Sequence, residues 1–500
     1  MRAHTRTLIG FLAAVMLAVA CNIPQSAATP IVPIPSPSTQ PGPAAAQAAS
    51  QPVDVEALLR HAPVAWFAPL APMPMSAGRN YIGSEDFMEL FEPDAPWQSA
   101  AGRIQVFKLY GEWVAYHATD AQLRQAVQDI QRRGMALAVE AGPLDAPGDC
   151  GQGVESFAGR AEGLRIARRI RDAGGTLNLI ALDEPYFFAH VYDGPNACHW
   201  PVDKVAVEVD KYIKSMQQEI PGVIIGDTEP LTGAADAAAY KGWLDTFRKI
   251  NGYNFAFLHM DVDWARPQWP QEVKSLIEYE QQSSVPVGMI YIGNNFDASD
   301  EQYFTVTGQR VKKLELQAGA VPAHVVFQSW VDKPDHALPE TQPNTWTSFI
   351  NQYFTDKTAL GQKREGAGAN LALEKPALVS RELGQDVGSL AVDGDVGTLW
   401  NSGDAPTQWI EIDLGAEYSI RAIRMVPSQY PAGRTVHRVT VRGADGSARE
   451  LYVFDGATED GQVLEHVLAS PEVGVRYVRV ETVSSPSWVA WREIEVIAAD

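Results

Sequence analysis

Acidic side chains stand at the ends of several apolar stretches, where they could exchange protons with a bound substrate. The stretch Leu177–Asp183 ends in two adjacent acids, Asp183 and Glu184, and Pro185 follows directly. Three other apolar stretches end in acids, at Glu140, at Asp227 and Glu229, and at Asp261 and Asp263. Two carboxylates that flank a cleft can carry out general acid–base chemistry, because one donates a proton while the other accepts a proton or attacks.

Side-chain alternation along a strand predicts which of these acids reach a substrate. The predicted strand Asn254–Met260 is followed directly by Asp261, Val262 and Asp263. The apolar residues Leu258 and Met260 share one face, so Asp261 and Asp263 fall on the other. We expect the apolar face to pack against outer helices. Asp261 and Asp263 are therefore predicted to face the axis of the fold.

Adjacent residues of a strand point to opposite faces, so we expect only one of Asp183 and Glu184 to contact a substrate. We predict that Glu184 does so because it lies further out. Its catalytic partner is predicted to be Asp261, with Glu229 as the second choice. Supporting, structural or orienting roles are expected for the remaining acids, Asp183, Asp227, Asp263 and Glu140.

The segment 53–355 supplies the elements that position these acids, because apolar stretches alternate in it with amphipathic ones. The predicted strands are Val64–Leu70, Arg103–Tyr110, Met135–Ala141, Leu177–Asp183, Gly222–Asp227, Asn254–Met260, Val287–Ile292 and His324–Trp330. The predicted helices are Ala121–Arg133, Gly159–Asp172, Val205–Glu219, Ala237–Ile250 and Gln271–Gln282. Eight strand–helix repeats in about 300 residues predict a closed (β/α)8 barrel with catalytic groups at the carboxyl ends of its strands. An open doubly wound sheet is the alternative, although no glycine-rich phosphate loop follows the first strand.

Aromatic and amide side chains at other strand ends would suit a sugar-binding cleft. The predicted substrate-binding residues are Trp66, Tyr110, Trp264, Asn294, Gln328 and Trp330. The segment broadly resembles glycoside-hydrolase barrels, without matching a named family. It departs from the large group that has a nucleophilic glutamate on the seventh strand, because the sequence around Ile292 reads Tyr-Ile-Gly-Asn-Asn. Retaining and inverting chemistry both stay open, since they differ in the carboxylate separation.

The segment 370–500 has short alternating apolar stretches separated by turns, which predicts an antiparallel β-sandwich after a polar linker at 356–369. Its motifs are Asn370-Leu-Ala, Lys375-Pro-Ala, Ala391-Val-Asp-Gly-Asp-Val-Gly-Thr-Leu-Trp, Trp409-Ile-Glu-Ile-Asp-Leu-Gly, Arg476-Tyr-Val-Arg-Val and Trp491-Arg-Glu-Ile-Glu-Val. Together they resemble a discoidin-type domain, the coagulation factor 5/8 type C fold, and are close to family 32 carbohydrate-binding modules.

The resemblance implies a structural calcium ion, with ligands at Asp393, Asp395, Thr398 and Glu493. Calcium prefers several oxygen ligands from a tight loop, and the Asp-Gly-Asp segment offers them. A simple turn at 393–394 is the alternative. A sugar platform in the loops is predicted from Tyr430, Arg434, His437 and Trp488. Relatives also bind phospholipid or protein, so the fold alone leaves the ligand open.

The first 52 residues look like an export signal and a spacer. Residues 1–20 have a basic start and a short apolar run, which is typical of a signal peptide. Cys21 follows in a sequence that resembles a bacterial lipobox, so we expect it to carry a lipid; cleavage and release is the alternative. Residues 21–52 are rich in Pro, Ala and Ser and predict an extended spacer.

The two remaining cysteines, Cys150 and Cys198, form an even pair in an oxidising compartment, which predicts a disulfide between them. Two free thiols are the alternative. The location predicted by these features is extracytoplasmic and bacterial, as a surface lipoprotein or a secreted protein. The lipid anchor is the only membrane contact that we expect.

The net charge and the absence of two catalytic motifs narrow the range of possible functions. The excess of 61 acidic over 40 basic residues argues against nucleic acid or an anionic membrane as partner. The sequence contains neither HExxH nor G-x-S-x-G. We expect a monomeric glycoside hydrolase that acts on oligo- or polysaccharide, needs no cofactor for catalysis and is targeted by a carbohydrate-binding domain. The alternatives are a non-catalytic glycan-binding lipoprotein and an adhesin that binds protein or lipid.

Overall fold

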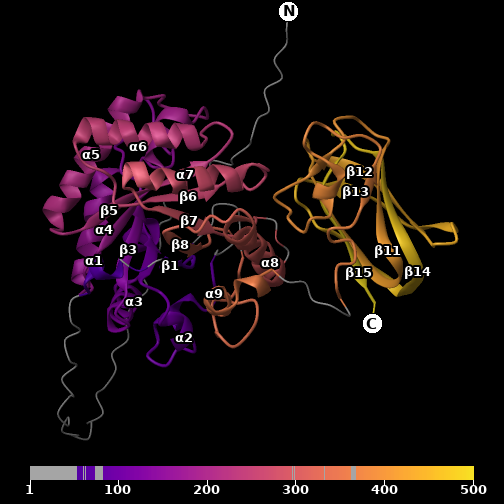
Figure 1. Ribbon diagram of the computed structural model, residues 1–500, viewed down its shortest axis with the longest axis horizontal. Helices are drawn as coiled ribbons and strands as arrows, with labels where there is room; N and C mark the ends of the chain where they lie inside the picture. Colours follow the sequence, from indigo (N-terminus) through magenta and orange to yellow (C-terminus); the bar gives the residue numbers. More distant parts are fainter. Residues whose placement is uncertain are drawn as a thin grey trace, which may run out of the picture.

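The computed structural model describes residues 53–73 except 60 and 62, 83–361 except 296, 298 and 332, and 368–499. Within these ranges the chain forms a barrel of parallel strands followed by an antiparallel sandwich, which lies beside helix α8 in Figure 1. The predicted signal peptide, the lipidation site Cys21 and the spacer to residue 52 lie outside the described residues.

Eight parallel strands close the barrel in sequence order, because β1 pairs with both β2 and β8. The strands are β1 Val64–Ala68, β2 Val106–Tyr110, β3 Ala136–Ala141, β4 Leu179–Asp183, β5 Ile224–Leu231, β6 Leu258–Val262, β7 Val287–Tyr291 and β8 His324–Gln328. Each predicted strand overlaps one of these. The predicted (β/α)8 barrel is confirmed, and the open-sheet alternative is wrong.

Helices surround the barrel strands (Figure 1). The α-helices are α1 Val55–Leu58, α2 Gln98–Ala101, α3 Asp120–Arg132, α4 Gly159–Asp172, α5 Val202–Glu219, α6 Ala237–Asn251, α7 Trp269–Ser283, α8 Asp300–Val311 and α9 Trp346–Thr355. The 3-10 and π-helical turns are η1 Phe87–Phe91, η2 Trp113–His117, η3 Phe187–Val191, η4 Lys312–Gln317, η5 Lys357–Ala359 and η6 Gly388–Ala391. Side-chain capping explains where α3 begins, because Thr119 and Gln122 form a capping box there.

Two apolar layers position the strand ends. The barrel interior holds the buried side chains of Val64, Trp66, Val106, Ala136, Ala138, Leu179, Ala181, Phe257, Ile290 and Val326. Leu258 and Met260 instead belong to the large core between the strands and the helices. The predicted alternation on β6 is therefore confirmed, because Phe257 faces inward and its neighbour Leu258 faces outward. On β4, Asp183 comes two positions after Ala181 on this inward face and lies at the carboxyl end of the strand.

The sandwich is antiparallel, as predicted, with the strand order β10-β15-β11-β14-β12-β13 and β9 paired to β11. Its strands are β9 Ala377–Val379, β10 Trp400–Asn401, β11 Gln408–Pro427, β12 Gly433–Arg442, β13 Ala448–Thr458, β14 Leu464–Ser484 and β15 Ala490–Ala498. Trp400 and Trp491 are fully buried in its core. In the described part of the chain, no helix is long and apolar enough to cross a membrane.

Cys150 and Cys198 form a disulfide, which confirms the predicted pairing and excludes two free thiols. The bridge joins the β3–α4 loop to the segment after η3, with a sequence separation of 48 residues. Both segments follow strands whose carboxyl ends carry acids. The disulfide therefore restrains the loops that surround these acids.

Removing the disulfide should lower the stability of the barrel. A bridge that closes a loop of this length contributes about 2–4 kcal/mol, because it restricts the unfolded chain. We expect Cys150→Ser with Cys198→Ser to unfold at a lower temperature than the parent in calorimetry. The matched control is Cys21→Ser, which should leave the transition unchanged. An unchanged transition in the double variant would contradict this stabilising role.

Candidate functional site

Glu184 leaves β4 in a strained conformation. Its φ angle is +53°, a value that non-glycine residues rarely adopt and that is often found at functional sites. The backbone N–H of Glu184 donates to the carbonyl of Thr228 at 3.0 Å, which fixes the turn. The side chain is 9% exposed and makes no hydrogen bond among the described residues. Glu184 therefore presents a buried carboxyl that no described residue bonds.

Asp183 and Glu184 both contribute to the same acidic group, contrary to our expectation that only one would reach it. Leu179 and Ala181 face the barrel interior, so Asp183 continues that face. The left-handed backbone of Glu184 breaks the alternation. Burial, followed by the charge of Glu155, raises the pKa of both carboxyls well above its usual range.

Asp261 completes the group from the end of β6. Its side chain is partly exposed and lies on the inward face of the strand. Burial, and then the charges of Glu155 and Glu140, raise the pKa of Asp261 to about 8. Asp261 also acts electrostatically on Glu184. The structure thus brings together the two acids that the sequence analysis preferred as a catalytic pair.

Glu155 belongs to the same acidic group, and the sequence analysis missed it. It lies in the β3–α4 loop, five positions after Cys150. Its charge acts on Asp183, Glu184 and Asp261. The protein around it and the charge of Glu140 raise its pKa to about 7, although its side chain keeps contact with solvent. The signal that could have revealed it is the predicted disulfide, which folds this loop over the strand ends.

A buried lysine lies beneath the acids. Lys108 is fully buried in the middle of β2 and forms an ion pair with Glu140. Its charge also lowers the pKa of Asp183 and Asp261, against the larger upward effects of burial and the neighbouring carboxylates. Gln328 approaches Glu140 at 3.4 Å from the end of β8. A lysine inside an apolar strand was a sequence signal that the analysis passed over.

Asp227 and Glu229 face away from the barrel axis. Asp227 accepts a hydrogen bond from the indole of Trp243 at 2.7 Å. The carboxylate of Glu229 is fully buried and accepts hydrogen bonds from the backbone N–H groups of Tyr186 and Phe187, at 2.7 and 3.0 Å. Glu229 therefore positions the turn after Glu184. Of the two acids predicted as partners of Glu184, only Asp261 therefore lies on an inward face.

The predicted substrate-binding residues divide into two groups. Tyr110, Gln328 and Trp330 lie at the carboxyl ends of β2 and β8, and the Tyr110 hydroxyl donates to the carbonyl of Ser329 at 2.7 Å. Trp66 is a correction: it lies in the middle of β1 and is fully buried against Phe257, so it cannot contact a substrate.

Trp264 and Asn294 contact the sandwich side of the barrel instead of the acids. The carboxylate of Asp395, in the sandwich, lies 3.1 Å from the guanidinium of Arg310 and accepts a hydrogen bond from Asn294 at 2.9 Å. Arg310 is 2% exposed and stacks over the Trp264 ring at 4.2 Å. Burial acts to raise the pKa of Asp395, but Arg310 and the N–H of Gly397 outweigh it, and the pKa is lowered. A buried ion pair thus joins the sandwich to the barrel.

Three of the four predicted calcium ligands, Asp393, Thr398 and Glu493, meet at the Asp-Gly-Asp loop. The carboxylate of the fourth, Asp395, is paired with Arg310. The Thr398 hydroxyl donates to the Asp393 carboxylate at 3.0 Å and to the Asp395 carbonyl at 2.8 Å. Glu493 is fully buried, and its Oε1 atom has no partner. Burial and the charge of Asp393 raise the pKa of Glu493. An unpartnered buried carboxylate oxygen beside a second carboxylate fits a bound cation.

Two aromatic side chains form the exposed part of the predicted sugar platform. Tyr430 is 77% exposed and Trp488 is 43% exposed, and the Ser487 hydroxyl accepts a hydrogen bond from the Tyr430 N–H at 3.2 Å. Their loops are therefore adjacent. Arg434 is exposed but paired in two hydrogen bonds with Asp455. His437 is a correction, because it is 3% exposed and packs against the core residue Trp491.

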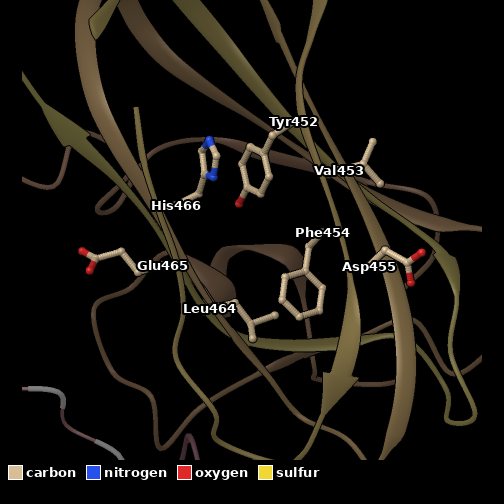
Figure 2. A pocket seen from close by; sticks show the side chains of 7 residues that line it. All are labelled: Tyr452, Val453, Phe454, Asp455, Leu464, Glu465 and His466. Carbon is tan, nitrogen blue, oxygen red and sulfur yellow. The ribbon is translucent and has the colours of Figure 1, made fainter. Parts of the chain in front are cut away.

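A separate pocket of about 230 Å³ lies between β13 and β14. Figure 2 shows the side chains that line it, including Tyr452 and His466. These two rings stack at a centroid distance of 3.8 Å. Both rings are only partly exposed, whereas Tyr430 and Trp488 are exposed.

Comparison with known proteins identifies the sandwich. Residues 378–494 match the family model of the F5/8 type C domain. The sandwich is an F5/8 type C domain. The predicted resemblance is thus confirmed for this part of the chain, and its antiparallel sheet has the discoidin fold. No curated protein matches the chain.

Several solved structures are similar to part of the chain. The family 32 carbohydrate-binding module from Clostridium perfringens NanJ, in complex with galactose, is 20% identical, with 26% of this chain and 97% of that chain covered and a TM-score of 0.24. The family 32 module of AlyQ, in complex with 4,5-unsaturated mannuronic acid, is 17% identical over 25% and 95% of the chains, with a TM-score of 0.22. A chitosan-binding module from Paenibacillus sp. IK-5 is 25% identical over 27% and 100%, with a TM-score of 0.23.

The ion pair between Asp395 and Arg310 should stabilise the docked F5/8 type C domain. Removal of one partner from a buried pair leaves an uncompensated charge and costs about 3–5 kcal/mol. We expect Asp395→Asn to lower the unfolding temperature in calorimetry and to separate the barrel transition from the sandwich transition.

The matched control is Asp455→Asn, which breaks the exposed pair with Arg434 in the same domain. An exposed pair contributes little because water and salt screen it, so this variant should unfold almost as the parent does. Equal behaviour of the two variants would show that the Asp395 pair does not hold the domains together.

Proposed function

We propose that the barrel is a glycoside hydrolase and that the F5/8 type C domain binds the glycan on which it acts. The observation that carries this proposal is the position of Glu184 and Asp261 at the carboxyl ends of β4 and β6. Both carboxyls have a raised pKa, and the charge of Asp261 contributes to that of Glu184. Two such groups on one side of a barrel are suited to acid–base cleavage of a glycosidic bond.

Within this proposal Glu184 is the general acid and Asp261 the base or nucleophile. Ionisation of one carboxyl raises the pKa of the other, so a coupled pair retains one proton near neutral pH. Glu184 is the more deeply buried of the two and holds the proton more firmly. Asp261 has greater solvent contact and ionises first. Asp183 and Glu155 add negative charge that keeps the proton on the acid.

Hydrolysis should depend on both acids and on pH. We expect Glu184→Gln and Asp261→Asn each to lower kcat by about a hundredfold or more, because each removes a proton-transfer group. The measurement is product release from α- and β-linked oligosaccharides and polysaccharides. In the parent enzyme the rate should rise as the pH increases through about 8, because Asp261 has a pKa of about 8 and must ionise to act as the base. At still higher pH the rate should fall, because Glu184, whose pKa is raised well above its usual range, then loses the proton that it donates.

A suitable control is Asp263→Asn, which removes a neighbouring acid for which we propose no proton transfer. Full activity of both Glu184→Gln and Asp261→Asn would contradict the assignment. Glycan binding without turnover by the parent protein would favour the alternative function, a non-catalytic glycan-binding protein. The exposed pair Tyr430 and Trp488 supports that alternative as well as the hydrolase.

The F5/8 type C domain is proposed to bind carbohydrate through Tyr430 and Trp488. Two solved relatives are family 32 modules in complex with sugars. An exposed aromatic ring can pack against the apolar face of a pyranose. The N-terminal sequence supports export, so we propose an extracytoplasmic protein, anchored through Cys21 or secreted, that acts as a monomer.

A structural calcium ion is proposed for the Asp-Gly-Asp loop, with Asp393, Thr398 and Glu493 as side-chain ligands. When bound, the ion would supply positive charge to two buried acids. We expect a chelator to lower the unfolding temperature of the F5/8 type C domain by several degrees in calorimetry, because binding to the native state stabilises it.

The control for the calcium experiment is Glu493→Gln, which should unfold at the same temperature with and without chelator. Addition of excess calcium should reverse the effect of the chelator on the parent protein. An unfolding temperature that does not respond to chelator in the parent would contradict the calcium site.

A further inference from the structure

The carboxyl end of the barrel holds more acids than the proposed hydrolysis requires. Two carboxylates suffice for cleavage of a glycosidic bond. Five acids lie at the ends of β3, β4 and β6 or in the β3–α4 loop, and we call them the acidic mouth: Glu140, Glu155, Asp183, Glu184 and Asp261. Lys108 is paired with Glu140. Among the described residues, the other four acids form no ion pair.

Three buried polar side chains at the acidic mouth also lack partners. Glu184 is 9% exposed and makes no hydrogen bond within the described chain. The Thr228 hydroxyl, which pairs in register with Asp183, and the Gln328 Oε1 atom, beside Glu140, are buried and unpartnered. Buried polar groups are seldom left unpaired in native proteins. These atoms indicate a ligand with several hydrogen-bonding groups.

The acids are not arranged around a single small ion. In the described part of the chain, no group of three or more His, Cys, Asp or Glu residues could hold a metal ion. The carboxyl groups are instead distributed over the ends of β3, β4 and β6 and the β3–α4 loop, and a bound cation beside them would favour their ionised form. A distributed charge is best compensated by a ligand that carries several positive groups along its length.

We propose that the acidic mouth binds a cationic glycan, an oligosaccharide of amino sugars with free amines. This inference rests on the proposed function for its sugar class. The ammonium groups would form charge-assisted hydrogen bonds with the unpaired carboxylates, and sugar hydroxyls would satisfy Thr228 and Gln328. Tyr110 and Trp330, at the ends of β2 and β8, lie where they can contact a sugar ring.

The test compares two matched ligands, the β-1,4-linked hexasaccharide of glucosamine and its fully N-acetylated, uncharged form. Binding is measured by calorimetry on the full chain with Glu184→Gln and Trp488→Ala, which prevent turnover and weaken the exposed aromatic platform. We expect the amine form to bind about tenfold tighter at about 20 mM salt, and this preference to shrink at about 300 mM, because salt screens charge pairs.

Two variants that each remove one negative charge test whether the amine form binds at the acidic mouth. Glu155→Gln, in the same background, should weaken binding of the amine form by about three- to tenfold and leave the acetylated form unchanged. Glu278→Gln is the control, because this substitution removes the same charge from a residue that is exposed on the outer helix α7. It should leave the binding of both ligands unchanged.

The outcomes distinguish failure of this inference from failure of the proposed hydrolase function. Equal or tighter binding of the acetylated form overturns the cationic ligand, while hydrolysis of neutral glycans would leave the proposed function intact. Preferential amine binding that depends on Glu155 supports the inference even if the parent protein cleaves nothing. Equally tight binding of an oligolysine of the same charge overturns the sugar class. Failure to bind either this amine form or an α-1,4-linked galactosamine oligomer overturns the inference as well.

Discussion

Mutual repulsion among carboxylates at the carboxyl end of the barrel is the constraint on which the local structure depends. Water would screen these charges, but the barrel removes much of that water, so the acids hold protons at unusually high pH. Lys108 offsets part of the charge from inside the barrel. The fold must therefore hold the acids together against their repulsion, and stored repulsion of this kind is typical of functional sites.

Several covalent and polar contacts hold the acids in place. The disulfide between Cys150 and Cys198 restrains the loop that carries Glu155. The carboxylate of Glu229 binds two backbone N–H groups directly after Glu184 and stabilises its left-handed turn. An acid that we first considered as a catalytic partner thus positions the turn that follows Glu184. Loss of such support can disturb a reaction as much as loss of a reacting group does.

The contact between the two domains extends this support to the far side of the barrel. Arg310 links the sandwich residue Asp395 to the ring of Trp264, three positions after Asp261. The same loop carries Asp393, which faces Glu493 on its other side. The loop that carries Asp393 and Asp395 is therefore physically connected to the barrel segment after Asp261. The F5/8 type C domain therefore helps to hold this part of the barrel in place.

The sequence by itself determined the eight-stranded barrel, the sandwich and its family, the disulfide and the placement of acids at strand ends. These depend on local periodicity, on short motifs and on counting, which a sequence displays directly. Only the tertiary structure decided which acids meet. A left-handed residue at Glu184 breaks the alternation rule, Glu155 reaches the mouth through a long loop, and Trp66 and His437 are buried. Such outcomes depend on contacts between residues far apart in the chain, which periodicity does not encode.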